Sequence, residues 1–259
     1  MAPPTSPIII LTGASRGLGL SVLRILLSKY NARVATLSRT LTPELQAVID
    51  EYNNGEDRVL AVQGDVGKEE DNVRVVSETT KKWGGLDGLV LNAGSIDPVG
   101  KLADIPTSAL IPYVQTNLLS TIYLIQPALP HLRSSKGKIV LVSSGASTSG
   151  YQAWGLYSMA KAGMNSLART IASEEKDTGV GIWSVRPGMV NMQAFLRSNG
   201  PGQMADSDMV KFQSAYEKGE LLAPEQPGSV LAGLAVDGPL ELNGEYINWA
   251  DDRLQAFRG

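Results

Sequence analysis

The sequence predicts an α/β protein in which a parallel sheet is covered by helices on both faces. Short runs such as residues 8–11 and 139–142 are apolar at every position, which is typical of strands buried on both faces of a parallel sheet. These runs alternate with longer segments of helical periodicity, as in proteins whose parallel strands are joined by helices. The chain has 259 residues, 43% of them hydrophobic, and we find no linker or repeat. We therefore expect one domain over residues 1–259.

The composition excludes several classes of function. The formal charge is −3 and 19% of the residues are charged, so we expect neither nucleic-acid binding nor a disordered polyelectrolyte. Cysteine is absent and His131 is the one histidine, so we predict no disulfide, no thiolate chemistry and no metal site. Residues 1–7 lack the features of a signal peptide, and no apolar run approaches the ~20 residues of a membrane span. We expect a soluble, cytoplasmic protein without a membrane segment.

A glycine-rich loop follows the first predicted strand, residues 8–11. It contains Gly13, Gly17 and Gly19, and a helical pattern begins at Leu18. Strand, glycine loop and helix form the setting of a dinucleotide-binding fingerprint. In that setting Gly13 permits a tight turn, Gly17 lets the backbone approach a pyrophosphate, and Gly19 lets the helix pack on the strand. The alternative is a purely structural glycine turn. The fingerprint predicts a Rossmann-type doubly wound fold.

The end of the second predicted strand, residues 33–39, indicates which dinucleotide would bind. An NAD site usually has an acid here for the ribose 2′-hydroxyl. This chain has Ser38 and Arg39, with no carboxylate before Glu44, and Arg16 adds a second cation within the glycine loop. Two guanidiniums suit a 2′-phosphate, so we predict NADP(H) as the cofactor. The alternative is that both arginines are simply solvated.

The next elements continue the alternation. Thr42, Pro43 and Glu44 form a helix start, with an N-cap, a proline at the first position and an acid in the first turn. That helix is expected to end near Asn53. A strand at 58–63, a helix at 69–83 and a strand at 86–91 follow. Parallel strands joined by helices require right-handed crossovers.

A long helix is predicted over residues 107–132, with Asn117 at its centre. Asn is a poor residue inside a helix, so Asn117 indicates a local distortion with a polar role, or else lies on the surface. Pro127 and Pro130 should bend or loosen the end of the helix. His131 lies near that end, where we expect a structural role.

The next predicted helix, residues 154–175, carries Tyr157 and Lys161. It follows a strand at 137–145 that ends in two serines, Ser143 and Ser144. Positions four residues apart share one helix face, so the phenol and the ammonium should project together. A free tyrosine titrates near pH ~10, and a nearby cation favours its ionised form. The pair therefore indicates acid–base chemistry, although this spacing also occurs by chance.

The final third predicts two further strands and an irregular excursion. The strands cover residues 181–185 and 245–249, with a helix at 230–236 between them. Residues 192–227 break the alternation beyond the end of a strand, where a lid or substrate loop would lie. The complete prediction is a seven-stranded parallel sheet flanked by helices.

In this order and spacing, the motifs resemble those of the short-chain dehydrogenase/reductase family over nearly the whole chain. The motifs are the glycine loop, Asn92-Ala93-Gly94, Asn117, Ser144, Tyr157, Lys161 and Pro187-Gly188. The family spacing selects Ser144 rather than Ser143, because Ser144 precedes the tyrosine by thirteen residues.

The resemblance implies a hydride-transfer site in which the cofactor supplies the hydride. Tyr157 would donate a proton to a substrate carbonyl oxygen, and Ser144 would hydrogen-bond the same oxygen. Lys161 would lower the pKa of Tyr157 and hold the nicotinamide ribose. Asn117 would hold a water that links Lys161 to solvent.

The resemblance also implies a set of cofactor contacts. They are Gly13, Ser15, Arg16, Gly17, Leu18, Gly19, Ser38, Arg39, Asp65, Val66, Asn92, Ala93, Gly94, Tyr157, Lys161, Pro187, Gly188, Val190 and Asn191. Asn191 departs from the family, which usually has threonine after Pro-Gly-x-Val.

Within the family, the chain resembles the fungal benzil (1,2-diketone) reductases and the sepiapterin reductases. The first resemblance implies a small dicarbonyl substrate, and the second a pterin side-chain ketone. Ser144 and Tyr157 would contact either substrate. Trp154 would form an aromatic wall of the pocket or belong to the core, and Asp251 would anchor an amino-pterin or lie on the surface. A catalytically idle NADPH-sensing interaction protein is the alternative of a different class. Family members usually pair through the helices of Asn117 and Tyr157, which implies a homodimer or homotetramer.

Overall fold

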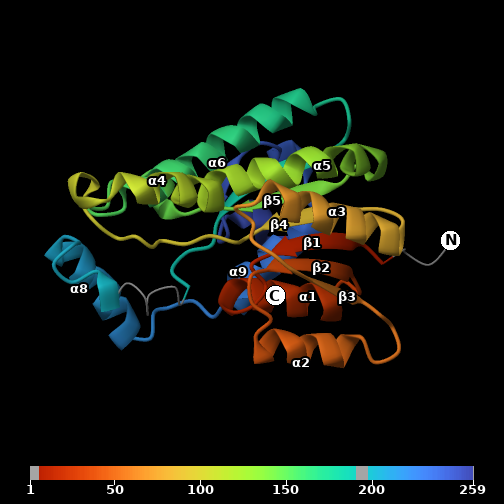
Figure 1. Ribbon diagram of the computed structural model, residues 1–259, viewed down its shortest axis with the longest axis horizontal. Coiled ribbons are helices and arrows are strands. Elements are labelled where there is room, and N and C mark those ends of the chain that lie inside the picture. The colour runs from red at the N-terminus through yellow and green to blue at the C-terminus, as the bar shows by residue number, and fades with distance from the viewer. Residues whose placement is uncertain (1–5, 191–197, 259) are drawn as a thin grey trace.

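The computed structural model describes residues 6–190 and 198–258, and its centre is a seven-stranded parallel sheet (Figure 1). The strand order is β3-β2-β1-β4-β5-β6-β7. The strands are β1 (Ile8–Thr12), β2 (Arg33–Ser38), β3 (Val59–Gln63), β4 (Gly88–Leu91), β5 (Lys138–Val142), β6 (Gly181–Arg186) and β7 (Tyr246–Asn248). The order reverses direction between β1 and β4, so a crevice lies beyond their carboxyl ends, where ligands bind in open sheets of this kind.

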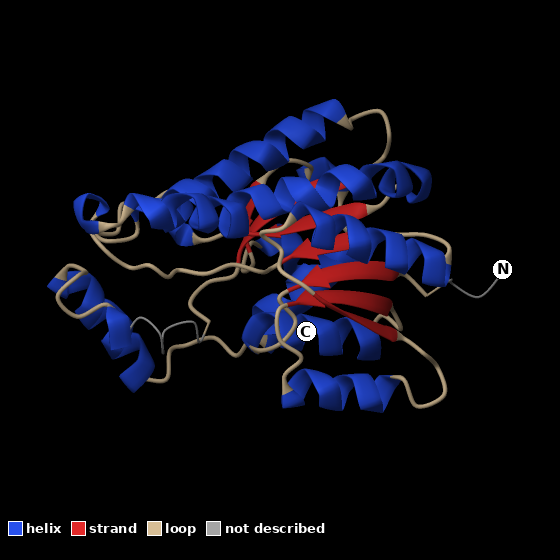
Figure 2. Cartoon of the chain, viewed as in Figure 1, coloured by secondary structure: helices blue, strands red, loops and turns tan. Residues whose placement is uncertain are grey.

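Helices cover both faces of the sheet (Figure 2). Side chains alternate along each strand: Ile9 packs in the cluster containing α1, α2 and α9, whereas Ile10 packs with α3, α5 and α6. These helices are α1 (Gly17–Ser28), α2 (Pro43–Tyr52), α3 (Glu69–Trp83), α5 (Ser120–Ser135), α6 (Gly155–Glu174) and α9 (Glu225–Asp237). Burial on both faces explains why runs such as residues 8–11 of β1 and 139–142 of β5 are apolar at every position. The predicted Rossmann-type doubly wound fold in a single domain is confirmed.

Local sequence rules account for several helix boundaries. Thr42 caps α2 by accepting a hydrogen bond from Leu45 N at 3.3 Å, and Pro43 occupies the first turn. α3 spans the predicted residues and ends at Gly84, whose φ of +83° suits glycine. The start of α9 at Glu225 precedes the predicted boundary, residue 230.

The predicted helix 107–132 consists of three parts. These are α4 (Thr107–Val114), a π-helical turn η2 (Gln115–Leu119) and α5. The distortion expected at Asn117 is therefore a π turn, a feature that is frequent at functional sites. The helix continues to Ser135 in spite of Pro127 and Pro130, because its apolar face, including Leu124 and Leu132, is buried against the sheet.

Beyond the sheet, the segment after β6 carries α8 (Asp206–Glu217), which lies at one end of the molecule in light blue (Figure 1). The expected lid begins at residue 192, so its first six residues lie outside the described ones. Met204 and Phe212 pack in a third cluster with Trp154 and Tyr157. The described residues also form four short 3₁₀ turns: η1 (Leu102–Asp104), η3 (Gly145–Ser147), η4 (Leu240–Leu242) and η5 (Asp252–Phe257). Among the described helices, none has the length and apolar character to cross a bilayer.

Candidate active site

Ser144, Tyr157 and Lys161 come together at the carboxyl edge of the sheet. Ser144 follows β5, and the other two lie on consecutive turns at the start of α6. The Tyr157 and Ser144 side chains are hydrogen-bonded to each other. Lys161 Nζ lies 5.7 Å from the centre of the Tyr157 ring and donates to the Val142 carbonyl at 2.7 Å. The structure therefore brings together three of the four predicted catalytic residues around one phenol.

Burial sets the protonation of this group. Tyr157 and Lys161 are only 6% and 3% exposed. Burial raises the pKa of Tyr157 to about 12, although the hydrogen bond with Ser144 acts to lower it. Burial also lowers the pKa of Lys161 to about 8. From the sequence we expect Lys161 to lower the pKa of Tyr157; in the structure the largest influence on that pKa is burial, which raises it. The phenol thus carries its proton at neutral pH.

Asn117 lies close to this group within the π turn. Its Oδ1 accepts from Ser95 N at 2.8 Å, its Nδ2 donates to the Tyr113 carbonyl at 3.1 Å, and the residue is 2% exposed. A Cβ added to Gly94 would lie 3.1 Å from Asn117 Oδ1 and 3.6 Å from Lys161 Nζ. Gly94 thus marks the point where the asparagine and the lysine approach one another, and its bare backbone leaves room there.

The glycine loop is attached to the end of β4. Asn92 Nδ2 donates to the Thr12 and Gly13 carbonyls at 3.1 and 3.0 Å, and Thr12 Oγ1 accepts from Asn92 N and Ala93 N at 3.1 and 3.0 Å. Gly13 has a φ of +71°, and a Cβ on Gly19 would lie only 2.1 Å from the Gly13 carbonyl oxygen. Both glycines are therefore required by geometry. The role of Thr12 was not predicted, although it directly precedes the first glycine.

The end of β2, where the adenosine ribose of the cofactor is predicted to bind, provides both positive charge and a hydroxyl without a hydrogen-bond partner. Arg16 and Arg39 are exposed, whereas Ser38 is buried and its Oγ has no hydrogen-bond partner among the described residues. Asp65 Oδ1 accepts from Gly67 N at 2.9 Å, and Val66 is buried beside it. An unpaired buried hydroxyl at the end of β2, next in sequence to the exposed Arg39, fits a phosphate-bearing ribose.

The Pro187-Gly188 loop follows β6. Gly188 has a φ of +76°, and a Cβ there would lie 2.6 Å from Leu222 and 3.0 Å from Trp249 Nε1. Val190 forms an isolated bridge with Leu222. This glycine allows the loop to close against the segment that precedes α9. Asn191, the predicted departure from the family, lies outside the described residues.

A buried polar network holds the Ser144 loop in place and was not predicted. Asn165, one turn after Lys161, accepts from the hydroxyls of Ser143 and Ser184 at 2.7 and 2.6 Å. Its Nδ2 donates to Ser147 Oγ at 2.9 Å, and Ser147 donates to the Ser144 carbonyl at 2.6 Å. Asn165 thus connects α6 to Ser143 at the end of β5, to β6 and to η3. A polar residue on the otherwise apolar face of a helix was the available signal.

Trp154 is buried and forms part of an aromatic cluster beside Tyr157. Its ring is perpendicular to that of Tyr157 at 5.8 Å and stacks on Phe212 at 5.5 Å. Its Nε1 donates to Met204 Sδ at 3.3 Å. The predicted aromatic wall is therefore covered by the α8 segment on one side and touches the phenol on the other.

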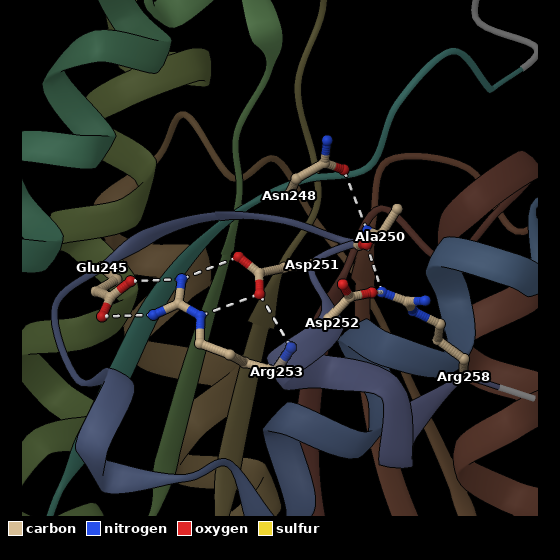
Figure 3. Close-up of polar contacts among 7 residues, drawn as sticks. All are labelled: Glu245, Asn248, Ala250, Asp251, Asp252, Arg253 and Arg258. Atoms are coloured by element: carbon tan, nitrogen blue, oxygen red, sulfur yellow. Dashed lines mark hydrogen bonds and ion pairs between the residues drawn. The ribbon is translucent and has the colours of Figure 1, made fainter.

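The Asp251 carboxylate is bound by Arg253, two residues further along the chain (Figure 3). Its two carboxylate oxygens accept from Arg253 Nε and Nη2 at 3.0 and 2.9 Å, and Arg253 also pairs with Glu245 at 3.0 Å. The hydrogen bond with Arg253 lowers the pKa of Asp251 to about 2. Asp251 would have to give up Arg253 before it could anchor a substrate amine.

The doubly wound sheet, the glycine loop on its first crossover and the Ser-Tyr-Lys group are the features of one class of oxidoreductase. The chain belongs to the short-chain dehydrogenase family, whose model matches residues 7–200. Enzymes of this family use nicotinamide dinucleotides and act on small molecules.

Individual relatives match over almost the entire chain. A benzil reductase ((S)-benzoin forming) of Saccharomyces cerevisiae is 34% identical over 97% of this chain and 99% of its own. A crystal structure of a short-chain dehydrogenase/reductase from the same yeast has a TM-score of 0.93 at 33% identity, covering 98% of this chain and 100% of that one. Another yeast structure, described as a cytoplasmic protein with unknown function, has a TM-score of 0.81 at 30% identity, with 98% and 100% covered.

Proposed function

We propose that this protein is an NADPH-dependent carbonyl reductase that transfers hydride to one ketone of a small, benzil-like 1,2-dicarbonyl. The observation that carries the proposal is the buried Tyr157 phenol, hydrogen-bonded to Ser144 and adjacent to Lys161. The similarity to a yeast benzil reductase supports the substrate class.

The residues divide the chemistry between them. Bound NADPH supplies the hydride. Tyr157, protonated at neutral pH because burial raises its pKa to about 12, donates its proton to the carbonyl oxygen. Ser144 donates a hydrogen bond to the same oxygen as negative charge develops on it. Lys161 and Asn117 then return a proton to the phenolate. A site with a protonated acid and a buried cation is suited to reduction.

The proposed preference for NADPH rests on the residues that would surround the adenosine ribose of the cofactor. Arg16 and Arg39 would pair with a 2′-phosphate, and Ser38 Oγ would gain the hydrogen-bond partner that it lacks. The remaining predicted cofactor residues lie along the same carboxyl edge, from the glycine loop to Val190. A carboxylate is absent from this end of β2, which also favours the phosphate over a free hydroxyl.

Three further proposals complete the description. The segment from 192 to 227 acts as a substrate lid, which the packing of Phe212 on Trp154 supports. The protein forms a homodimer or homotetramer through the face of α4 and α6, where Ile111 and Met159 are 68% and 48% exposed. Its location is cytoplasmic, as the description of one yeast structure suggests.

The test is NADPH oxidation with benzil by the wild type and by Tyr157→Phe. The phenylalanine variant keeps the ring that packs on Trp154 but has no proton to give. We expect its kcat to fall at least ~100-fold, the usual contribution of acid catalysis, while its affinity for NADPH is retained. Equal rates in the two proteins would exclude the mechanism. If the wild type binds NADPH but reduces no carbonyl compound, the NADPH-sensing alternative gains support.

A further inference from the structure

Arg186 is a cation beside the catalytic serine that the proposed mechanism does not use. It is the last residue of β6, and its side chain lies over Gly145, the residue directly after Ser144. A Cβ placed on Gly145 would lie 3.5 Å from Arg186 Nε and 3.7 Å from its Cζ. Because Gly145 has no side chain, the guanidinium can lie against the backbone of the loop that carries Ser144.

The charge of Arg186 is not neutralised locally. Its side chain is exposed and makes neither an ion pair nor a hydrogen bond with any described residue. Its neighbour across the sheet is Asn248 of β7. The acids on either side of that strand, Glu245 and Asp251, are both bound by Arg253 (Figure 3). The two acids that flank the adjacent strand are therefore paired with another arginine.

The backbone of Arg186 is held rigidly. Its carbonyl accepts from Trp249 N at 3.0 Å, and Pro187 follows it directly. A charged group at the end of a central strand is positioned more exactly than one on a loop. Ser144 is held at the neighbouring strand end, where its carbonyl accepts from the hydroxyls of Ser147 and Tyr246. The backbones that carry the Arg186 and Ser144 side chains are thus held next to one another.

We propose that Arg186 selects substrates that carry a carboxylate next to the reacting ketone, that is, 2-oxo acids with an apolar or aromatic substituent. This inference rests on the proposed carbonyl reductase function. A 2-oxo acid is a 1,2-dicarbonyl whose second carbonyl belongs to a carboxylate, and a guanidinium binds a carboxylate through two parallel hydrogen bonds. With the ketone oxygen at Ser144 and Tyr157, the carboxylate faces Arg186.

The reaction balances as a two-electron reduction. Hydride from NADPH forms the new C–H bond at the ketone carbon, and Tyr157 supplies the proton that converts the ketone oxygen to a hydroxyl. The products are NADP⁺ and a 2-hydroxy acid, and the carboxylate remains unchanged. A substrate amine anchored by Asp251 would need a free negative charge at the site. Arg253 neutralises the Asp251 carboxylate, so the charge available to a substrate is the positive charge of Arg186.

The experiment compares phenylglyoxylate with its neutral methyl ester, using NADPH and three proteins. The proteins are the wild type, Arg186→Gln and Arg186→Lys, and Arg169→Gln serves as a control at an exposed arginine on α6. We expect Arg186→Gln to lower kcat/KM for phenylglyoxylate about tenfold, the size of one lost charge-assisted contact. The ester should be unaffected. Arg186→Lys should retain part of the preference for phenylglyoxylate over the ester, and Arg169→Gln should have the same preference as the wild type.

Three results would overturn the proposal. One is an unchanged ratio of acid to ester in Arg186→Gln, and another is an equal loss for both substrates, which would make the arginine a support for the Ser144 loop. The third is a loss of NADPH affinity, which would place the guanidinium at the cofactor. If the wild type reduces neither of these two compounds nor benzil, the proposed function fails, and calorimetric binding of phenylglyoxylate to the NADP⁺-loaded protein then tests Arg186 separately. Binding that weakens about tenfold in Arg186→Gln supports the inference, and no binding to the wild type refutes it.

Discussion

The ammonium of Lys161 lies 5.7 Å from the centre of the Tyr157 ring, and both side chains are almost fully buried. Burial acts on the two groups in opposite directions, because it disfavours the charged form of each. The phenol therefore keeps its proton to a higher pH than a free tyrosine, and the ammonium loses its proton at a lower pH than a free lysine. At neutral pH the pair consists of a neutral acid and a cation, the form needed to reduce a carbonyl.

The lowered pKa of Lys161 predicts that stability depends on pH. Between its folded value of about 8 and its ordinary value of 10.5, the unfolded chain binds more protons at this position than the folded chain. The contribution of Lys161 to the free energy of unfolding therefore rises as pH increases through this window. Urea unfolding should show that the free energy of unfolding of the wild type increases between pH 7.5 and pH 9.5 by on the order of 2 kcal/mol more than that of Lys161→Met. Parallel changes in the two proteins would contradict the prediction.

Asn165 is predicted to position Ser144 through Ser147. Asn165→Ala removes the common acceptor of Ser143 and Ser184 and the donor to Ser147. We expect kcat for benzil to fall about tenfold as the Ser144 loop loosens, because each lost hydrogen bond in this network contributes about 1 kcal/mol. The affinity for NADPH should change little.

Thr79→Ala is the matched control for Asn165→Ala. Thr79 is a fully buried polar residue on α3, with its hydroxyl bonded to the Val75 carbonyl at 2.6 Å. The Thr79→Ala variant should have a free energy of unfolding lower by about 1 kcal/mol and an unchanged kcat. If the two variants show the same kcat at a temperature where both are folded, Asn165 is structural only.

Arg39→Asp should shift the cofactor preference towards NADH. An acid at the end of β2 accepts a hydrogen bond from a ribose hydroxyl and repels a 2′-phosphate. We expect the ratio of kcat/KM for NADPH to that for NADH to fall at least about tenfold. Arg33→Asp, at the opposite end of the same strand, is the control and should leave the ratio unchanged. A constant ratio in Arg39→Asp would refute the role assigned to this arginine.

Asp251→Ala distinguishes the two substrate classes. Since both carboxylate oxygens are bound by Arg253, we expect the substitution to affect sepiapterin and benzil equally. Arg253→Ala, which removes the same ion pair from its other side, should have a similar effect on both activities. A selective loss of sepiapterin reduction in Asp251→Ala, measured as kcat/KM, would instead identify this acid as an amine anchor.

The fold was predictable because its rules are local. The apolar strands, the helix of residues 69–83 and the Thr42 cap all follow from periodicity and capping within about a dozen residues. That Ser144, Tyr157 and Lys161 would lie together was predictable for a different reason: they occur at fixed spacings within two adjacent elements. The asparagine at 117 indicated a distortion, but its partner outside the helix, the backbone N–H of Ser95, could not be read from the helical pattern.

What the sequence did not reveal depends on long-range partners. The hydroxyl of Thr12 acquires its role from a strand about eighty residues away. Asn165 likewise gains three of its partners from β5, β6 and η3. Such contacts cannot be assigned before the topology is known.

The two ring contacts of Trp154 have a dynamic consequence. Its ring stacks on Phe212 of α8 and lies perpendicular to the ring of Tyr157. Local unfolding of the α8 segment would therefore remove the packing around Trp154 that limits the rotamers of Tyr157. Opening of α8 and loss of the Tyr157 alignment would then occur together, as one cooperative equilibrium. A ligand that orders α8 would slow amide hydrogen exchange in both α8 and the first turn of α6.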